Sequence, residues 1–443
     1  MNTKEIESLN NQFKNNFNII VDKIIDHLDK NYDENEKQKI LNYFNNHSIN
    51  LQEINNFLLK NQNDSNSIIL LGKFNDLGIR TSIDKQKTFE LYQKAADLGN
   101  AFGMNKLGYC YLNGIGTSIN KLKAFELYQN AADLGNSSGI NNLADCYING
   151  IGTSIDKQKA FELYQKAANL ENSSGNNSLG YCYQNGIGTS IDKQKAFELY
   201  QKAADLGNST GINNLADCYL NRIGTSIDKQ LAFELFQKAA DLGNPSGINN
   251  LADCYLNGIG TSIDKQLAFE LFQKAADLGN PSGISNLADC YRNGIGTNID
   301  KQKAFELYQK VADLGNSYGI FNLADCYLNG IGTSIDKQKV FELYQKAADL
   351  GNSSGIFNLA DCYLNGIGTS IDKQKAFELF QKAADLGNNI AQYKLAFMYE
   401  RGYGIKKNKN QAIYWYEKSA EQGYQYAQNK IRELTNVNYL YNK

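Results

Sequence analysis

Residues 135–170 read GNSSGINNLADCYINGIGTSIDKQKAFELYQKAANL, and this 36-residue unit returns in near-identical form along most of the chain. All eight cysteines recur at the same interval: Cys110, Cys146, Cys182, Cys218, Cys254, Cys290, Cys326 and Cys362. A strict period of this length predicts one structural unit copied end to end, in which each unit buries its faces against its neighbours. The usual expectation of about three separate compact domains for 443 residues therefore does not apply.

Each unit predicts two helices. In the first, helix A, Gly139, Leu143, Cys146 and Tyr147 recur at helical spacing and share one side. Two turn glycines in the sequence GIG (150–152) indicate its end. The segment TSID (153–156) provides capping side chains for the second helix, helix B, whose inward stripe centres on Tyr164.

This pattern predicts an all-α protein, a right-handed α-solenoid of the tetratricopeptide type with about ten 36-residue helix-turn-helix units. We divide the chain into an N-terminal helical cap or linker at residues 1–63, ten repeats at 64–423 and a C-terminal capping helix at 424–443. In the last segment Ala427, Ile431 and Leu434 fall at the expected buried positions.

The small and aromatic positions of the unit resemble the Sel1-like repeat. They are Gly139, Leu143, Ala144, Tyr147, Gly150, Gly152, Asp156, Lys159, Ala160, Tyr164, Lys166, Ala167 and Ala168. The resemblance implies a non-enzymatic protein-interaction scaffold or adaptor, with a role in signalling. Three units depart from the pattern: Arg80 and Arg222 replace turn glycines, and Glu171 replaces a glycine after helix B. We expect each change to adjust a loop without breaking the array.

The first 62 residues do not follow the period. An apolar stripe predicts a long amphipathic helix, and shorter helices are predicted near Ile40–Phe44 and Ile54–Leu59. The stripe consists of Ile6, Leu9, Phe13, Phe17, Ile20, Ile24 and Leu28. The segment either caps the array or forms a docking helix that mediates self-association. It also resembles the linker that follows a kinase domain in some fungal Sel1-repeat proteins.

Composition limits the classes of partner. A formal charge of −2 argues against nucleic-acid binding, because neutralising phosphates needs surplus lysine and arginine. No stretch approaches 18 uncharged apolar residues, so we expect no membrane span. The N-terminus lacks the apolar region of a signal peptide, which favours a cytoplasmic protein.

The residues that could carry chemistry are better explained structurally. In the cysteine register other units carry Phe74, Met398 and Leu434, so the cysteines are interpreted as small core residues, with neither metal binding nor disulfides. The GIGTS segment resembles a phosphate loop but lacks the lysine of a Walker motif. Both histidines, His27 and His47, lie outside the repeats. We therefore expect no cofactor and no catalytic site.

The polar side of helix A is the remaining candidate. Asparagine and aspartate recur there three residues apart, and we call these residues the ribbon: Asn142, Asp145, Asn214, Asp217, Asn250, Asp253, Asn286, Asp289, Asn322, Asp325, Asn358 and Asp361. Aromatic residues interrupt this side at Tyr109, Tyr181, Tyr318, Phe321 and Phe357. In tetratricopeptide-like stacks helix A lines the concave face, so the ribbon is a hypothetical binding surface for a peptide or protein segment of basic character. The alternative is a merely solvated face.

Three functional hypotheses follow. The leading one is the interaction scaffold. The second is an enzyme-associated module, either a kinase-linked regulator or a relative of β-lactam hydrolases, for which no catalytic constellation of Ser, His or Cys with a base is present. The third is a passive structural spacer, which differs from the scaffold only in whether the face of helix A binds anything.

Overall fold

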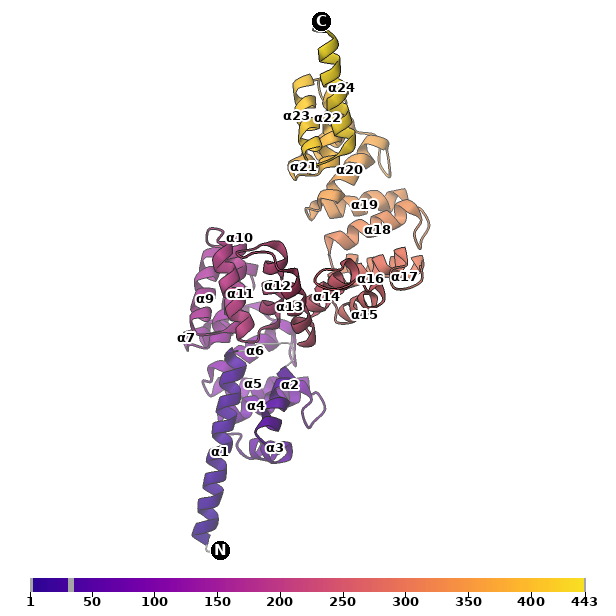
Figure 1. Cartoon of the computed structure of the whole chain (residues 1–443). Helices are drawn as coiled ribbons and strands as arrows, with labels where there is room; N and C mark the ends of the chain where they lie inside the picture. The colour runs from indigo at the N-terminus through magenta and orange to yellow at the C-terminus, as the bar shows by residue number, and fades with distance from the viewer. Residues whose placement is uncertain (1–2, 31–35, 442–443) are drawn as a thin grey trace. The chain divides into compact units, whose positions relative to one another are not determined.

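The computed structural model describes the backbone of residues 3–30 and 36–441, and the side chains of 16–30 and 36–434. In this part of the chain every regular element is an α-helix, and the helices follow one another in pairs (Figure 1). The predicted all-α repeat fold is therefore confirmed. The chain forms two compact units, Met1–Ile263 and Asp264–Lys443, and each is described by itself.

The first unit begins with three helices outside the repeats, α1 (Thr3–Lys30), α2 (Glu36–Asn46) and α3 (Leu51–Lys60). Its A helices are α4 (Ser65–Leu77), α6 (Ala101–Asn113), α8 (Ser137–Asn149), α10 (Ser173–Asn185), α12 (Ser209–Asn221) and α14 (Pro245–Asn257). Its B helices are α5 (Lys85–Asp97), α7 (Lys121–Asp133), α9 (Lys157–Asn169), α11 (Lys193–Asp205) and α13 (Lys229–Asp241). Consecutive A helices contact each other from α4 to α14.

The second unit continues the alternation. Its B helices are α15 (Lys265–Asp277), α17 (Lys301–Asp313), α19 (Lys337–Asp349), α21 (Lys373–Asp385) and α23 (Lys409–Glu421). Its A helices are α16 (Pro281–Asn293), α18 (Ser317–Asn329), α20 (Ser353–Asn365) and α22 (Asn389–Arg401), followed by α24 (Gln425–Tyr441). In α24 Ala427 is buried as predicted, whereas Ile431 and Leu434 are only half-buried.

Short polar side chains and turn residues determine where each helix begins and ends. In α8 the Asn136 side chain accepts a hydrogen bond from the Gly139 amide at 2.7 Å, and in α9 Asp156 accepts one from the Lys159 amide at 2.9 Å. Helix α8 ends at Gly150, whose φ of 66° is a left-handed conformation that suits glycine. Arg222 adopts the same conformation at the end of α12, with φ 57°, so the helix-turn geometry persists without glycine.

Small residues let the helices pack closely. A Cβ added at Gly139 would lie 2.7 Å from the Ala131 Cβ, because α8 crosses α7 at this point. Leu143 and Cys146 fill the core beside them and are each 1% exposed. Burying a side chain the size of leucine stabilises the fold by about 1.5–3 kcal/mol. The prediction that the cysteine register belongs to the core is confirmed, since all eight thiols are buried.

The N-terminal helices pack against the A helices of the first repeats. Helix α1 contacts α3, α4 and α8, and buries Val21, Ile24, Ile25 and Leu28. Phe17 and Ile20 are partly buried against the same core. The predicted stripe residues Ile6, Leu9 and Phe13 lie outside the described side chains.

Candidate interaction surface on the A helices

The polar side of helix A is less exposed than the sequence suggested. Ribbon residues such as Asn142 and Asp145 are half-buried, and Asn322 is only 4% exposed. Ser138 and Asn141, which the helical pattern assigns to the same polar side, are each 7% exposed. The polar side of helix A is therefore only partly exposed, because neighbouring A helices pack closely enough to cover part of it.

The ribbon asparagines in the first unit bond the A helices to one another. Asn142 on α8 donates from Nδ2 to Asn105 Oδ1 on α6 at 2.8 Å. The same bond joins Asn214 to Asn177 at 2.9 Å and Asn250 to Asn213 at 3.0 Å. We call these bonds rungs, and each joins a ribbon asparagine to the residue 37 positions earlier. Half of the proposed ligand-binding amide groups are thus already used in holding consecutive repeats together.

One rung is missing, between α8 and α10. The ribbon position of α10 is Ser178, and the residue 37 positions earlier is Asn141. The Asn141 Oδ1 is buried and accepts no hydrogen bond within the described residues, while its Nδ2 lies 3.3 Å from Asp145 Oδ2. A buried acceptor without a donor costs about 1–3 kcal/mol. The serine side chain is too short to replace the asparagine donor of the other rungs.

Burial raises the pKa of five ribbon aspartates: Asp145, Asp217, Asp253, Asp325 and Asp361. Burial raises the pKa of Asp145 to about 6, although a hydrogen bond from the Tyr164 hydroxyl acts in the opposite direction. Burial alone raises the pKa of Asp217 and Asp253 to about 6. Asp289 and Asp325 accept similar hydroxyl bonds at 2.5 Å, from Tyr308 and Tyr344. The helical pattern of helix A alone does not identify these tyrosine partners, although each lies 19 residues after its aspartate.

The aromatic candidates divide into two groups. Tyr109, Tyr181 and Tyr318 present 37%, 52% and 47% of their surface to solvent, so they remain available for contact. Phe321 and Phe357 are half-buried instead, because each packs against the aromatic ring of its own repeat's helix B, Tyr344 or Phe380. The two phenylalanines contribute mainly to packing within the repeat.

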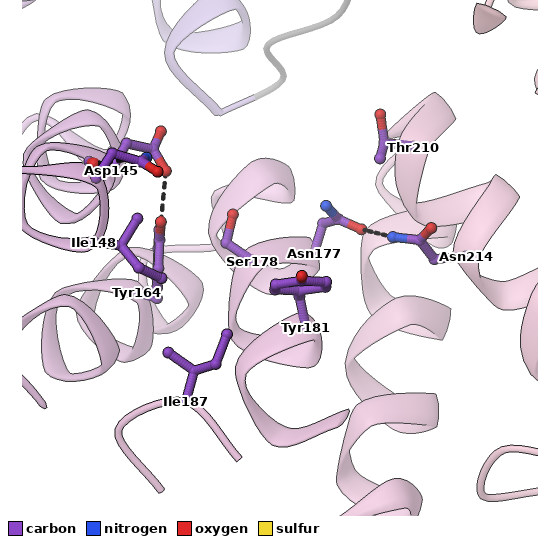
Figure 2. A pocket seen from close by; sticks show the side chains of 10 residues that line it. Asp145, Ile148, Tyr164, Asn177, Ser178, Tyr181, Ile187, Thr210 and Asn214 are labelled. Atoms are coloured by element: carbon purple, nitrogen blue, oxygen red, sulfur yellow. Dashed lines mark hydrogen bonds between the residues drawn. The ribbon is translucent and has the colours of Figure 1, made fainter. Parts of the chain in front are cut away.

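A pocket of about 560 Å³ opens on this side of the first unit. Helices α8, α9, α10 and α12 supply its walls, which include Asp145, Tyr164, Asn177, Ser178, Tyr181 and Asn214. Figure 2 shows Ser178 between Asp145 and Tyr181, with the Asp145–Tyr164 bond on one side and the Asn177–Asn214 rung on the other. The structure thus brings three predicted site residues, Asp145, Tyr181 and Asn214, together at the missing rung.

In the first two repeats, α2, which lies outside the array, contacts the residues at the ribbon positions. Lys73 on α4 occupies the repeat position that Asp145 occupies on α8. Lys106 on α6 occupies the position of Asn142 on α8 and of Ser178 on α10. Glu36, the first residue of α2, forms ion pairs with both lysines, and all three residues are buried. Burial opposes ionisation of Glu36, but Lys106 and Lys73 hold its pKa at about 2. The sequence does not predict this cluster, because nothing in the repeat pattern places residue 36 near the repeats.

Helix α1 contributes a second contact to the same face. The Asp29 carboxylate accepts hydrogen bonds from the Ser137 and Ser138 amides at the start of α8, at 3.1 and 3.2 Å. The Asn172 side chain donates to the Asp29 backbone carbonyl at 2.9 Å. The Asp29 carboxylate thus supplies acceptors to the free amides of the first turn of α8. The A helices of the first three repeats therefore bind segments of this chain.

The last repeats of the second unit contain their own cation. Lys394, at the ribbon position of α22, lies 3.5 Å from Asp361 on α20, 33 residues earlier. Burial raises the pKa of Asp361, and Lys394 acts in the opposite direction. An ammonium group therefore compensates the half-buried carboxylate in this pair of repeats.

The buried thiols are only weakly acidic. Burial raises the pKa of the Cys146 thiol to about 12, so it is a poor nucleophile at neutral pH. Among the described side chains, those of residues 16–30 and 36–434, no cluster of three or more His, Cys, Asp or Glu is placed to hold a metal ion. No helix in that part of the chain is long and apolar enough to cross a membrane.

Comparison with known proteins places the repeats in a described class. The family model of the Sel1 repeat matches ten consecutive segments: residues 65–100, 101–136, 137–172, 173–208, 209–244, 245–280, 281–316, 317–352, 353–388 and 389–424. The comparison with curated proteins found no significant match.

Solved structures include similar repeat proteins. The protective antigen c5321 of uropathogenic Escherichia coli, which displays an SLR fold, is 27% identical over 88% of this chain and 91% of its own, with a TM-score of 0.42. A Sel1 repeat protein from Oxalobacter formigenes is 24% identical over 74% of this chain and 93% of its own, with a TM-score of 0.47. Cysteine rich protein B of Helicobacter pylori is 30% identical over 30% of this chain and 94% of its own, with a TM-score of 0.25.

Proposed function

We propose that this chain, which belongs to the Sel1-repeat family, is a scaffold that binds a segment of another protein on the A helices of its first unit. Proteins built from such repeats generally serve as interaction scaffolds and not as catalysts, because stacked repeats present long continuous surfaces. The observation that carries the proposal is the open pocket of about 560 Å³ between α8, α10 and α12.

Two further features support this location. The same face of the first repeats already holds α1 and α2 through charged side chains, which is the contact chemistry that an external segment would use. The exposed Tyr181 ring stands at the pocket, and aromatic residues of this kind frequently anchor protein interfaces.

A core built on eight buried thiols suits a reducing compartment, so we assign the scaffold to the cytoplasm. There it joins a partner to a signalling assembly. Within the second unit, the ribbon residues Asn286, Asp289, Asp325 and Asn358 form a separate candidate surface, although Asn322 is too buried to take part.

Site-specific photo-crosslinking tests the proposal. A benzophenone amino acid at Tyr181 in the full-length chain is expected to capture a protein partner in cells. The matched control is the same group at Leu122, which is 57% exposed on helix B of the second repeat. Capture from Leu122 alone, or equally from both positions, would show that the A-helix pocket is not the binding site.

A further inference from the structure

The ribbon of the first unit contains an acidic position, Asp145, that lies beside the missing rung and lacks a partner cation among the described side chains. Asp145 and Ser178 are 33 residues apart, like Asp361 and Lys394 and like Lys73 and Lys106. In the Asp361–Lys394 pair the lysine supplies the cation, and in the Lys73–Lys106 pair Glu36 of α2 supplies an anion. For Asp145 no ion pair is formed among the described residues.

The surroundings of Asp145 are suited to a group that donates several hydrogen bonds. Asn141 contributes the Oδ1 that lacks a donor at the missing rung, and its side chain is buried, with 7% of the residue exposed. Its amide contacts the Asp145 carboxylate, so the orphaned acceptor and the charge belong to one cluster. Ser178 adds a hydroxyl at the pocket wall.

The same pocket offers a flat aromatic surface. Tyr181 lies one helical turn beyond Ser178 on α10, and half of its side chain is exposed. A guanidinium group is planar, carries five N–H donors and stacks on aromatic rings, whereas an ammonium group is a compact point charge. The combination of carboxylate, neutral acceptors and exposed ring favours the guanidinium.

We propose that the pocket at Asp145, Ser178 and Tyr181 binds an arginine side chain of the partner segment, in the position where Lys394 or Glu36 completes the equivalent pairs. The proposal rests on the scaffold function proposed above and names the chemistry that the face recognises. The arginine replaces the absent rung donor and neutralises Asp145.

Fluorescence anisotropy with a defined probe tests the inference. The probe is a labelled, alanine-based helical peptide that carries arginine at two positions one heptad apart. Matched probes carry citrulline, which keeps the shape but not the charge, or lysine. The full-length chain is expected to bind the arginine probe at least tenfold more tightly than the citrulline probe, and more tightly than the lysine probe.

Variants of the chain test the site itself. Ser178→Lys copies the arrangement of Lys394 and Asp361, so it should weaken binding of the arginine probe at least tenfold. Ser178→Asn restores the rung and should also weaken binding of the arginine probe. The resistance of this variant to thermal unfolding should equal or exceed that of the unmodified chain. Asp145→Asn removes the proposed counter-charge and should weaken binding of the arginine probe at least tenfold. Asp241→Asn removes the same charge at an exposed position of α13 and should change binding less than twofold.

The possible results separate the two proposals. Equal binding of arginine and citrulline probes, both weakened by Ser178→Lys, would overturn the arginine assignment but leave a peptide-binding pocket. Undetectable binding of the arginine probe, or binding indifferent to Ser178→Lys and Ser178→Asn, would also overturn it. Crosslinking at Tyr181 tests the scaffold function independently of any probe.

Discussion

The Tyr164 hydroxyl donates a hydrogen bond of 2.5 Å to Oδ1 of Asp145, and so joins helix B to helix A of one repeat. Tyr164→Phe removes the donor and leaves the half-buried carboxylate with one bond fewer. We expect the free energy of unfolding to fall by about 1–2 kcal/mol, measured by urea denaturation of the full-length chain. No change would mean that water replaces the hydroxyl at no cost.

The reciprocal change is available two repeats later. Phe236 occupies the tyrosine position relative to Asp217, so this carboxylate lacks the hydroxyl. Phe236→Tyr should raise the free energy of unfolding by about 1 kcal/mol under the same conditions. A loss of stability would show that the core around Phe236 cannot accommodate the additional oxygen.

Asp217 also predicts a dependence of stability on pH. Its pKa is raised to about 6 in the folded chain, above the usual 3.8, so the folded state binds the proton more tightly than the unfolded state. The ionised carboxylate therefore costs stability above pH 6, and this cost disappears as the pH falls toward 4. Asp217→Asn should stabilise the chain by about 1 kcal/mol at pH 7.5, after allowance for residual exposure, and have no effect near pH 4.

The control for this experiment is Asp241→Asn, which removes a charge from an exposed helix end. A similar gain from both variants at pH 7.5 would indicate a general effect of net charge. A gain from Asp217→Asn that persists at pH 4 would contradict desolvation as its cause.

The cysteine register predicts buried and unreactive thiols. Burial raises the pKa of Cys218 to about 12, and the side chain has no exposed surface. Ellman's reagent should label none of the eight thiols of the folded chain at pH 8 and all of them in denaturant. Cys218→Ala should cost about 1 kcal/mol, and Cys218→Ser more, since the hydroxyl enters an apolar core. Serine tolerated better than alanine would contradict a purely apolar role.

The buried ion cluster predicts a large effect from a neutral substitution. Glu36→Gln leaves Lys73 and Lys106 buried without their shared anion, and removing one partner of a buried ion pair typically costs about 3–5 kcal/mol. Hydrogen exchange should show α2 losing protection first. The triple variant with both lysines changed to methionine should recover much of the loss; if it does not, then packing of Glu36 and not its charge holds α2 in place.

The turn at Arg222 predicts a stabilising substitution. Its left-handed backbone disfavours any side chain, so Arg222→Gly should raise the free energy of unfolding by about 0.5–1 kcal/mol. The matched test is Gly258→Arg in the next repeat, where φ is 66° and the change should destabilise by a similar amount. In thermal unfolding, Arg222→Gly should raise the midpoint temperature and Gly258→Arg should lower it.

Local features were readable from the sequence because they depend on neighbours within one unit. The 36-residue period, the helical spacing of Leu143 and Cys146, and the turn glycine at 150 each follow from local geometry. The cysteines were also assigned correctly to the core, because Phe74 and Met398 stand in the same register and are buried.

The contacts of the polar side were not readable in this way. The rung from Asn214 to Asn177 and the bond from Tyr164 to Asp145 depend on how closely adjacent helices pack, which the helical period of one helix does not determine. The ion pairs of Glu36 depend on where a non-repeated segment folds back.

The sequence alone therefore determined the repeat, its two helices and its buried register, because a repeat interacts mainly with identical neighbours and each local signal is copied many times. Only the tertiary structure decided that the first A helices bind α1 and α2, that the ribbon asparagines link repeats, and that Ser178 interrupts them beside Asp145. These features arise from single departures and long-range contacts, whose energies depend on distances that a periodic pattern does not contain.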